Sequence, residues 1–421
     1  MQTDEVVKCR EALEALRSGV PNHEAVRVLG SNQREVEDLF AAALESTRGA
    51  EAAGQRIPGL LISGGFGAGK SHLLEYLEHT ALAEGFVCSR VSVSKETPLY
   101  DPVKMVQAAV DDAVLPDANG QLIQEVASRL DPSTEQYAEL NAWANSPGSG
   151  LNAVFPATLL LHEKIIRSDP ELVDQITGFW SGERLAISRI RQGLKQVNSV
   201  ARYQLKSPRV KELARQRFLF TSQLIRAAGY RGWVLLIDEV ELIGRYSLLQ
   251  RGRSYAELAL WLGKIRGEGV PGVVAVAAIT DDFALAVLKE KGDREIVGQR
   301  FRSKGSDEFT ILAGRAEAGM RLIERSAIAL RPPDESVLHD TYQRLKRIHG
   351  EAYSWDPPEI AQQERSVARR MRSYVRRWVN EWDLRRLYPG MDTAPEEDQT
   401  APFTYDEDTD LAPPDHPETE G

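Results

Sequence analysis

The chain has 421 residues, 42% of them hydrophobic, and a formal net charge of −10. This length permits two or three domains around a substantial core, and the longest apolar stretch, residues 270–279, is too short to span a membrane. The acidic, amphipathic start excludes a signal peptide, and two cysteines are too few for a disulfide framework and lack the neighbours of a zinc site. We therefore expect a soluble protein of the reducing cytoplasm, without membrane contact.

The negative charge is unevenly placed. Residues 391–421 contain eleven aspartates and glutamates and no lysine or arginine, so the rest of the chain is close to neutral. The same segment is rich in proline, and this composition is typical of disordered chain. We predict an acidic disordered tail over residues 391–421.

The first part of the chain, residues 1–50, predicts a helical segment. The run EALEALRSG ends at a glycine stop, and REVEDLFAAALEST follows a Ser-Asn pair that suits a helix N-cap. This segment precedes the part of the chain that carries the recognisable chemistry.

A short apolar strand, residues 60–62, leads into four glycines within six residues and then into a helix with leucines at helical spacing. Gly64, Gly69, Lys70 and Ser71 match the pattern G-x-x-x-x-G-K-[ST]. Glycines let backbone N–H groups wrap around phosphate oxygens, and the helix presents the positive end of its dipole to the same anion. The sequence thus predicts an ATP site rather than a glycine-rich turn that binds nothing. Its contact residues are Gly64, Gly65, Phe66, Gly67, Ala68, Gly69, Lys70, Ser71 and His72.

In this interpretation Lys70 reaches the β- and γ-phosphates and Ser71 holds Mg²⁺. An alternating strand over residues 86–94 and a long helical stretch over residues 101–229 follow. The next strand, GWVLLIDEVE, is a continuous apolar run that suits a central strand and ends in Asp238 and Glu239. We predict that Asp238 holds Mg²⁺ and that Glu239 polarises the attacking water; a helix N-cap is the alternative for this pair.

A third apolar strand, GVVAVAAIT, ends in Thr280, where a hydrogen-bonding sensor of the γ-phosphate is expected; the alternative is a simple strand-end threonine. A helix over residues 283–289, the basic run GDREIVGQRFRS and a further strand in DEFTIL follow. After these the chain predicts helices up to about residue 388.

This order of strands, P-loop, acidic pair and polar strand end resembles an AAA+ ATPase. The resemblance implies an α/β fold with a five-stranded parallel sheet in an ATPase domain over residues 51–312, and a C-terminal helical lid over residues 313–390. The helical insertion 101–229 after the second strand is similar to the initiator-like branch of that family, although it is much longer than usual.

A closer resemblance lies in ALRSGVPNHEAVRVLG, in GGFGAGKSHLLEYL followed by VSVSKETPLYDPVKMVQ, and in VRRWVNEWDLRRLYP. These stretches resemble the ATP-binding proteins of bacteriophage-exclusion (BREX) systems, the BrxC/BrxD family, with a length similar to the BrxD-type members. The resemblance implies an ATP-driven, DNA-associated component of bacterial anti-phage defence. It also implies partners among other defence proteins, such as a superfamily-2 helicase.

The AAA+ resemblance further implies a homo-oligomer in which one subunit supplies an arginine to its neighbour's nucleotide. Arg300 and Arg302 lie in the expected region, with Arg294 as a weaker candidate, because a guanidinium stays charged and contacts two phosphate oxygens. A solvated basic turn is the alternative.

A second basic cluster lies on a predicted lid helix, with apolar residues at helical spacing. Its members are Arg369, Arg370, Arg372, Arg376 and Arg377. Arg372 is the candidate for the lid's sensor arginine, and its neighbours suit the backbone of DNA; a solvated helix face is the alternative.

Two other functions remain open, a nucleotide-switch scaffold with little hydrolysis and an initiator- or transposon-type DNA loader.

Overall fold

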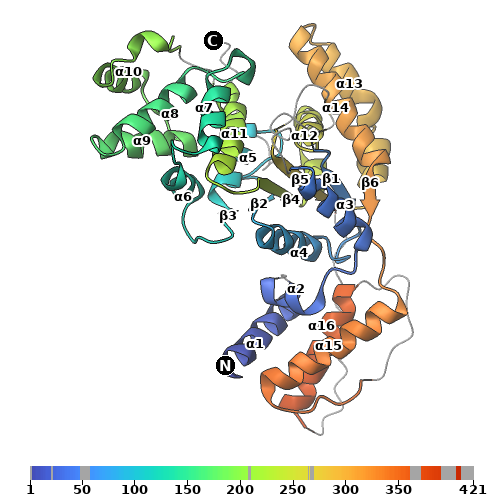
Figure 1. Cartoon of the computed structure of the whole chain (residues 1–421). Coiled ribbons are helices and arrows are strands. Elements are labelled where there is room, and N and C mark those ends of the chain that lie inside the picture. The colour runs from blue at the N-terminus through green and yellow to red at the C-terminus, as the bar shows by residue number, and fades with distance from the viewer. Residues whose placement is uncertain are drawn as a thin grey trace.

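The computed structural model describes residues 2–19, 22–47, 57–206, 210–263, 265, 270–360, 371–389 and 404–408. A central sheet carries helices on both faces, with a block of helices beside it and a separate helical module below it (Figure 1). The α/β class predicted from the sequence is confirmed. No helix in these described ranges is long and apolar enough to cross a membrane.

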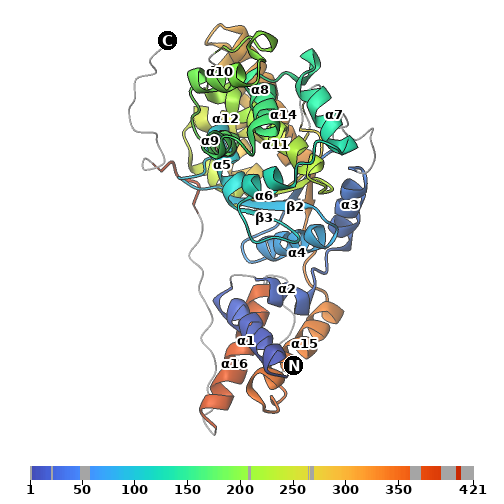
Figure 2. The same ribbon diagram turned by 60° about the vertical axis from the view of Figure 1, so that its left-hand side comes forward.

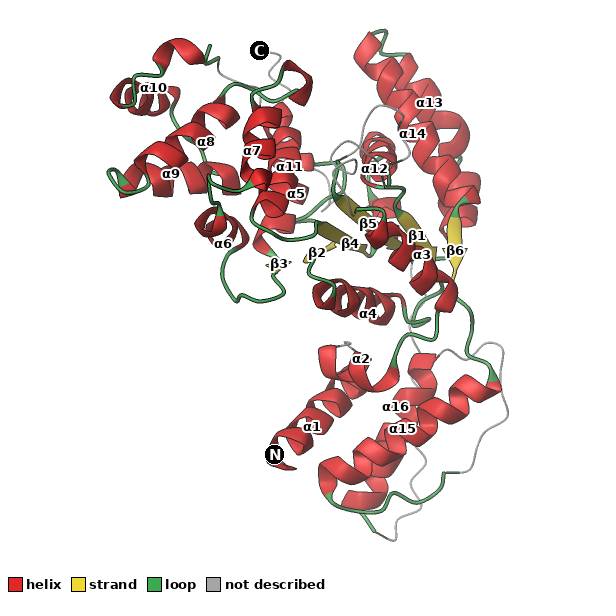
Figure 3. Cartoon of the chain, viewed as in Figure 1, coloured by secondary structure: helices red, strands yellow, loops and turns green. Residues whose placement is uncertain are grey.

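The sheet has six strands in the order β3-β2-β4-β5-β1-β6, where we predicted five. Neighbouring strands are parallel except at one edge, where β3 runs antiparallel to β2. Figure 3 shows the strands in yellow, enclosed by red helices. Their bounds are β1 Leu60–Ser63, β2 Val87–Ser92, β3 Ala113–Val114, β4 Trp233–Asp238, β5 Val273–Ile279 and β6 Ala327–Ala329.

The apolar composition of the two central strands follows from their burial. Every residue of β4 and of β5 is buried, as their uninterrupted apolar runs predict, because helices cover both faces of the sheet. On one face, α3 (Arg34–Glu45) and α4 (Lys70–Ala83) pack against the sheet. On the other face lie α5 (Pro102–Asp111), α11 (Val210–Ala227) and α12 (Leu248–Trp261). There Phe218 of α11 stacks on Trp233 of β4 with ring centroids 4.3 Å apart.

The strand predicted in DEFTIL is wrong. Helix α14 (Asp307–Arg325) begins there, and the Ser306 side chain caps it by accepting the Phe309 N–H group. The buried residues of α14, among them Ala313, Ala316 and Met320, recur at helical spacing, so the short apolar run belongs to a longer helical period. The fifth parallel strand is β6, which follows α14 and lies at the edge beside β1.

Residues between α5 and α11 form a helical block beside the sheet. Its aromatic core includes Phe155, whose ring centroid lies 5.4 Å from that of Phe179 and 5.1 Å from that of Phe220. The buried Trp180 indole donates a hydrogen bond to Thr158 Oγ1 at 3.0 Å. The helices of the block are α6 Leu122–Arg129, α7 Glu135–Ala144, α8 Val154–Ile165, α9 Pro170–Ser181 and α10 Ile187–Gln196.

The first and last helices of the chain form one module, although they are far apart in sequence (Figure 2). They share a buried core, and the fully buried His349 joins two of them, with Nε2 3.3 Å from Asp383 and Nδ1 accepting the Trp355 indole N–H group. Arg17 binds the same Asp383 at 2.6 Å. The module consists of α1 Gln2–Ser18, α2 His23–Leu29, α15 Glu335–Tyr353 and α16 Met371–Leu387.

One stretch of the acidic tail lies against the α/β core. Residues 404–408 contact the short 3₁₀-helix Val240–Arg245 after β4, and they also contact Phe283 and Lys291, which flank the π-helix Ala284–Glu290 after β5. The Tyr405 side chain is buried. These five residues therefore differ from the disorder that we expected over residues 391–421, and the remainder of the tail lies outside the described residues.

Candidate nucleotide-binding site

The glycine-rich loop joins β1 to α4 and has the shape of an anion cradle. Gly67 and Gly69 have positive φ angles of 73° and 100°, a region that residues with a Cβ rarely occupy. A Cβ on Gly69 would meet nothing within 4 Å, so open space lies in front of the helix. Gly69 is also the N-cap of α4 and has no side chain to bind the first-turn N–H groups. Room and backbone donors for an anion therefore coincide here.

Lys70 holds its ammonium group inside this loop. The side chain is only 8% exposed, and Nζ donates to the carbonyl oxygen of Gly64 at 2.8 Å and approaches that of Gly65 at 3.4 Å. It also lies 3.6 Å from Glu241 Oε1 and 5.4 Å from the centre of the Phe66 ring. A phosphate would offer this buried cation stronger, charge-assisted hydrogen bonds than the two neutral carbonyl groups do.

Asp238 ends β4 and is almost fully buried. Its Oδ1 accepts the Glu239 N–H group at 2.9 Å, and its Oδ2 binds Arg90 of β2 at 3.0 Å. Arg90 also binds Glu75 of α4 at 2.8 Å and donates to the Ser71 carbonyl oxygen at 3.3 Å. Sequence reasoning missed Arg90, for which the only signal was a cation within the strand beside β4.

Two glutamates follow Asp238 and have different environments. Glu239 is in the left-handed region with φ 57°. Its side chain reaches the surface but its carboxyl group is partly desolvated, and this desolvation and the Asp238 charge raise its pKa. Glu241 is only 4% exposed, and burial raises the pKa of its carboxyl group against the opposing effect of Lys70. Glu241 Oε2 has no hydrogen-bond partner within the described part of the chain. Sequence reasoning missed Glu241, although it stands only two positions after Glu239.

Thr280 follows β5 and is 2% exposed. The N–H group of Gly64 donates to the carbonyl oxygen of Ile279 at 3.1 Å, so the start of the P-loop and Thr280 lie beside each other at the carboxyl edge of the sheet. The Thr280 hydroxyl is 2.6 Å from the Tyr405 hydroxyl, a contact that nothing in the sequence indicated. The structure therefore brings Lys70, the Asp238–Glu239 pair and Thr280 to one edge.

Ser71 and His72 occupy the first turn of α4. Ser71 is half-buried, and its carbonyl oxygen and the Asp238 carboxylate both bind the Arg90 guanidinium. The His72 ring points to the N-terminal segment instead, where Nε2 lies 2.7 Å from the Gly30 carbonyl oxygen. Burial lowers the pKa of His72, so the ring is a neutral structural donor there. Only its backbone N–H group is placed to serve the cradle.

The arginines predicted as fingers lie on α13 (Asp293–Arg302), which packs on α14 at the far edge of the core from the helical block (Figure 1). Arg302 binds Glu317 at 2.6 Å, and Arg294 binds Glu324 at 3.2 Å. Arg300 is exposed and has no ion pair with another described residue. The three guanidinium groups are thus distinguished by their partners.

The second arginine cluster lies in the helical module. The Arg372 guanidinium lies against Gly19, at the carboxyl end of α1, and Arg377 is 3.9 Å from Glu381. Arg376 is half-buried, and Arg369 and Arg370 fall outside the described residues. The structure therefore does not group Arg372 with Lys70 and Thr280.

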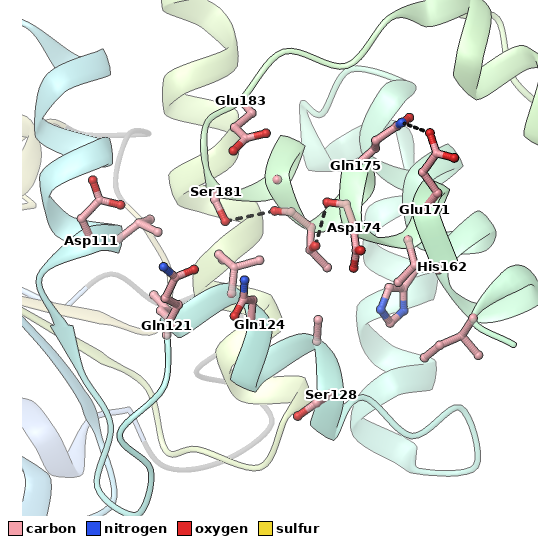
Figure 4. Close-up of a pocket in the computed structure, with 18 of the residues that line it drawn as sticks. Asp111, Gln121, Gln124, Ser128, His162, Glu171, Asp174, Gln175, Ser181 and Glu183 are labelled. Atoms are coloured by element: carbon pink, nitrogen blue, oxygen red, sulfur yellow. Dashed lines mark hydrogen bonds between the residues drawn. The ribbon is translucent and has the colours of Figure 1, made fainter. Parts of the chain in front are cut away.

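A separate cavity of about 950 Å³ lies in the helical block and shares no residue with the P-loop. Figure 4 shows polar side chains on its lining, several of them acidic. Gln175 donates to Glu171 across this surface at 3.1 Å. Within the described residues, no group of three or more histidine, cysteine, aspartate or glutamate side chains gathers as a metal site.

A mainly parallel sheet with a glycine-rich loop between β1 and α4, a buried lysine at the end of that loop and acidic residues after β4 are typical of a P-loop nucleotide-binding protein. The family model of the BREX system ATP-binding protein BrxC/D matches residues 7–110 and 215–381, and the chain belongs to this family of the phage-defence system. The unmatched residues between the two segments contain most of the helical block. Neither the comparison with curated proteins nor that with solved structures gave a match.

Proposed function

We propose that the protein binds and hydrolyses Mg²⁺-ATP at the loop between β1 and α4, and that it uses this cycle in phage defence. The observation that carries the proposal is the buried Lys70 ammonium group beside an open, glycine-lined cradle and facing an acidic cluster after β4. A buried cation that is held by carbonyl groups of its own loop is poised for a phosphate ligand.

Different residues of the site would bind the phosphates, the Mg²⁺ ion and the attacking water. Backbone N–H groups of residues 64–72 and the Lys70 ammonium bind the phosphates, and Ser71 and Asp238 supply the hydroxyl and carboxylate oxygens that Mg²⁺ prefers. When bound, Mg²⁺ neutralises charge on the phosphates. Arg90 binds Asp238 Oδ2, so the guanidinium and the cation would share this carboxylate. Glu239 orients the attacking water.

The order of the parallel strands, β2-β4-β5-β1-β6, supports an AAA+ ATPase, because the P-loop strand stands between β5 and β6 and the acidic pair follows the strand next to β5. We propose that α15 and α16 form the lid and that α1 and α2 belong to it, since the four share one core. The contact of His72 with the Gly30 carbonyl oxygen links this module to the P-loop helix, and Arg344 of α15 binds the Leu29 carbonyl oxygen of α2 within the module.

The partners that we propose are DNA, contacted through its backbone, other defence proteins such as a superfamily-2 helicase, and further copies of this chain. An initiator- or transposon-type loader would share the same ATPase core. A nucleotide switch with little hydrolysis is the second candidate function. The observation that favours it is the Thr280 hydroxyl, which is bound by Tyr405 rather than free for a nucleotide.

Replacing Lys70 by alanine tests the binding site. A hydrogen bond to a charged group contributes roughly 1.5–3 kcal/mol, so the Kd for ATP should rise about 10- to 150-fold. Isothermal calorimetry on the full chain measures this change. Lys164→Ala is the control, because Lys164 is exposed on α8 and, among the described residues, forms an ion pair only with its neighbour Glu163. Equal ATP affinity of Lys70→Ala and wild type would contradict the site.

Replacing Glu241 by glutamine should strengthen ATP binding. The buried carboxylate competes with phosphate for Lys70 and repels the triphosphate, so its neutralisation should lower the Kd roughly three- to tenfold. The same calorimetric titration measures this, with Glu84→Gln at the other end of α4 as the control. Weaker binding by Glu241→Gln would show that this carboxylate supports the nucleotide instead.

A further inference from the structure

The tail segment 404–408 is held by several independent contacts beside the nucleotide site. The Tyr405 ring packs on Gly244, so closely that a Cβ there would lie 2.5 Å from the ring, and it meets Phe283 edge-on at 5.6 Å. Lys291 donates to the carbonyl oxygens of Tyr405 and Gly244. The tyrosine is therefore seated in a site that has space only because residue 244 is glycine.

Acidic residues of the segment bind cations of the core. Asp408 forms an ion pair with Arg245 at 2.9 Å and donates its N–H group to the Arg245 carbonyl oxygen at 3.0 Å. Glu407 binds Arg251 at 2.8 Å. These contacts fix the segment on the C-terminal side of Tyr405 and place its two carboxylates on cations of the core.

The hydrogen bonds of Tyr405 determine the direction of the Thr280 proton. The Tyr405 hydroxyl lies 2.9 Å from Asp282 Oδ1 and 2.6 Å from Thr280 Oγ1. Burial raises the pKa of Tyr405, so the phenol keeps its single proton. Because a carboxylate only accepts, this proton goes to Asp282 and the Tyr405 oxygen accepts from Thr280. The only proton of the Thr280 hydroxyl is thus directed toward the tail.

We propose that Tyr405 is a positioning residue of the nucleotide site, which holds the Thr280 donor away from the γ-phosphate and restrains turnover while residues 404–408 are docked. This inference rests on the proposed ATPase function and on Thr280 as the γ-phosphate sensor. The Tyr405 hydroxyl and the γ-phosphate compete for the one proton of Thr280, so the docked segment and the bound triphosphate disfavour each other. By linkage, ATP weakens docking as much as docking weakens ATP binding.

The first test is Tyr405→Phe in the full chain, which keeps the ring on Gly244 and removes the hydroxyl. Release of one hydrogen bond should raise kcat about three- to tenfold, with KM for ATP within about twofold. In a Thr280→Val background the same change should raise nothing, because no donor remains to be released. A merely structural role for Tyr405 would not depend on Thr280.

The second test needs no turnover. Hydrogen exchange of the Asp408 amide should be at least tenfold slower in the wild type without nucleotide than with saturating Mg²⁺-ATP, and Lys70→Ala should abolish this difference. Two results together would overturn the role of the tail: a kcat of Tyr405→Phe that is equal to or below that of the wild type, and hydrogen exchange of the Asp408 amide that ATP does not change. They would do so even when Lys70→Ala shows the ATPase site to be correct. If Lys70→Ala leaves ATP turnover unchanged, the proposed function is overturned instead. If Asp408 exchange is then also insensitive to ATP, the inference about Tyr405 fails with it.

Discussion

Replacing Arg300 by alanine is expected to slow ATP turnover by about 10³- to 10⁵-fold while the Kd for ATP changes by less than about twofold. Phosphoryl transfer places charge on the γ-phosphate oxygens, and the P-loop lysine and the cation cover only one side of that group. Arg300 is exposed on α13 and has no ion pair among the described residues, so it would be available to a neighbouring subunit in the homo-oligomer that we propose. Phosphate release and equilibrium binding of ATP measure the two quantities.

Arg302→Ala is the matched control for Arg300→Ala. Arg302 lies two positions further on the same helix but is bound to Glu317, so its loss should cost far less turnover. Mixing Arg300→Ala with Lys70→Ala protein should restore part of the activity, because a mixed interface joins an intact P-loop to an intact arginine. If the two variants assemble together but the ATPase activity of their mixture never exceeds that of either variant alone, a site shared between subunits is contradicted.

Replacing Glu239 by glutamine should slow hydrolysis by about 10²- to 10⁴-fold and leave ATP bound, because a positioned proton acceptor contributes roughly this factor. Partial burial and Asp238 raise the Glu239 pKa, and the carboxylate form is the active one. Turnover should therefore fall on the acid side, as the pH drops through this raised pKa. Single-turnover hydrolysis at several pH values measures both effects.

Glu241→Gln separates the two carboxylates after β4. It removes a buried charge beside Lys70 rather than the exposed group at the strand end, so hydrolysis should persist in this variant. If Glu241→Gln loses hydrolysis while Glu239→Gln keeps full activity, Glu241 rather than Glu239 orients the attacking water.

Local patterns predicted the parts of the site that are local in sequence. The P-loop needs a strand, glycines and a helix within about twenty residues, and the strand before Asp238 needs only burial on both faces. The misassigned strand in DEFTIL shows the limit of this approach. Six residues of apolar and polar side chains fit both periods, and only the packing of α14 against α12 and the cap at Ser306 decide for a helix.

The residues that sequence reasoning missed depend on contacts between distant segments. Arg90 reaches Asp238 because β2 pairs with β4, and Tyr405 reaches Thr280 across more than a hundred residues. The joining of α1 and α2 to α15 and α16 is equally non-local. Hydrophobic spacing shows that each of these helices has an apolar face, but it does not identify the helix or strand against which that face packs.

The most direct measurement is the retention of labelled ATP by the full chain in the presence of Mg²⁺, followed by its conversion to ADP, for wild type, Lys70→Ala and Glu239→Gln side by side. We expect wild type to bind and convert ATP, Lys70→Ala to retain little ATP, and Glu239→Gln to retain ATP without converting it. Retention and conversion by Lys70→Ala at the wild-type level would contradict a nucleotide site at this loop.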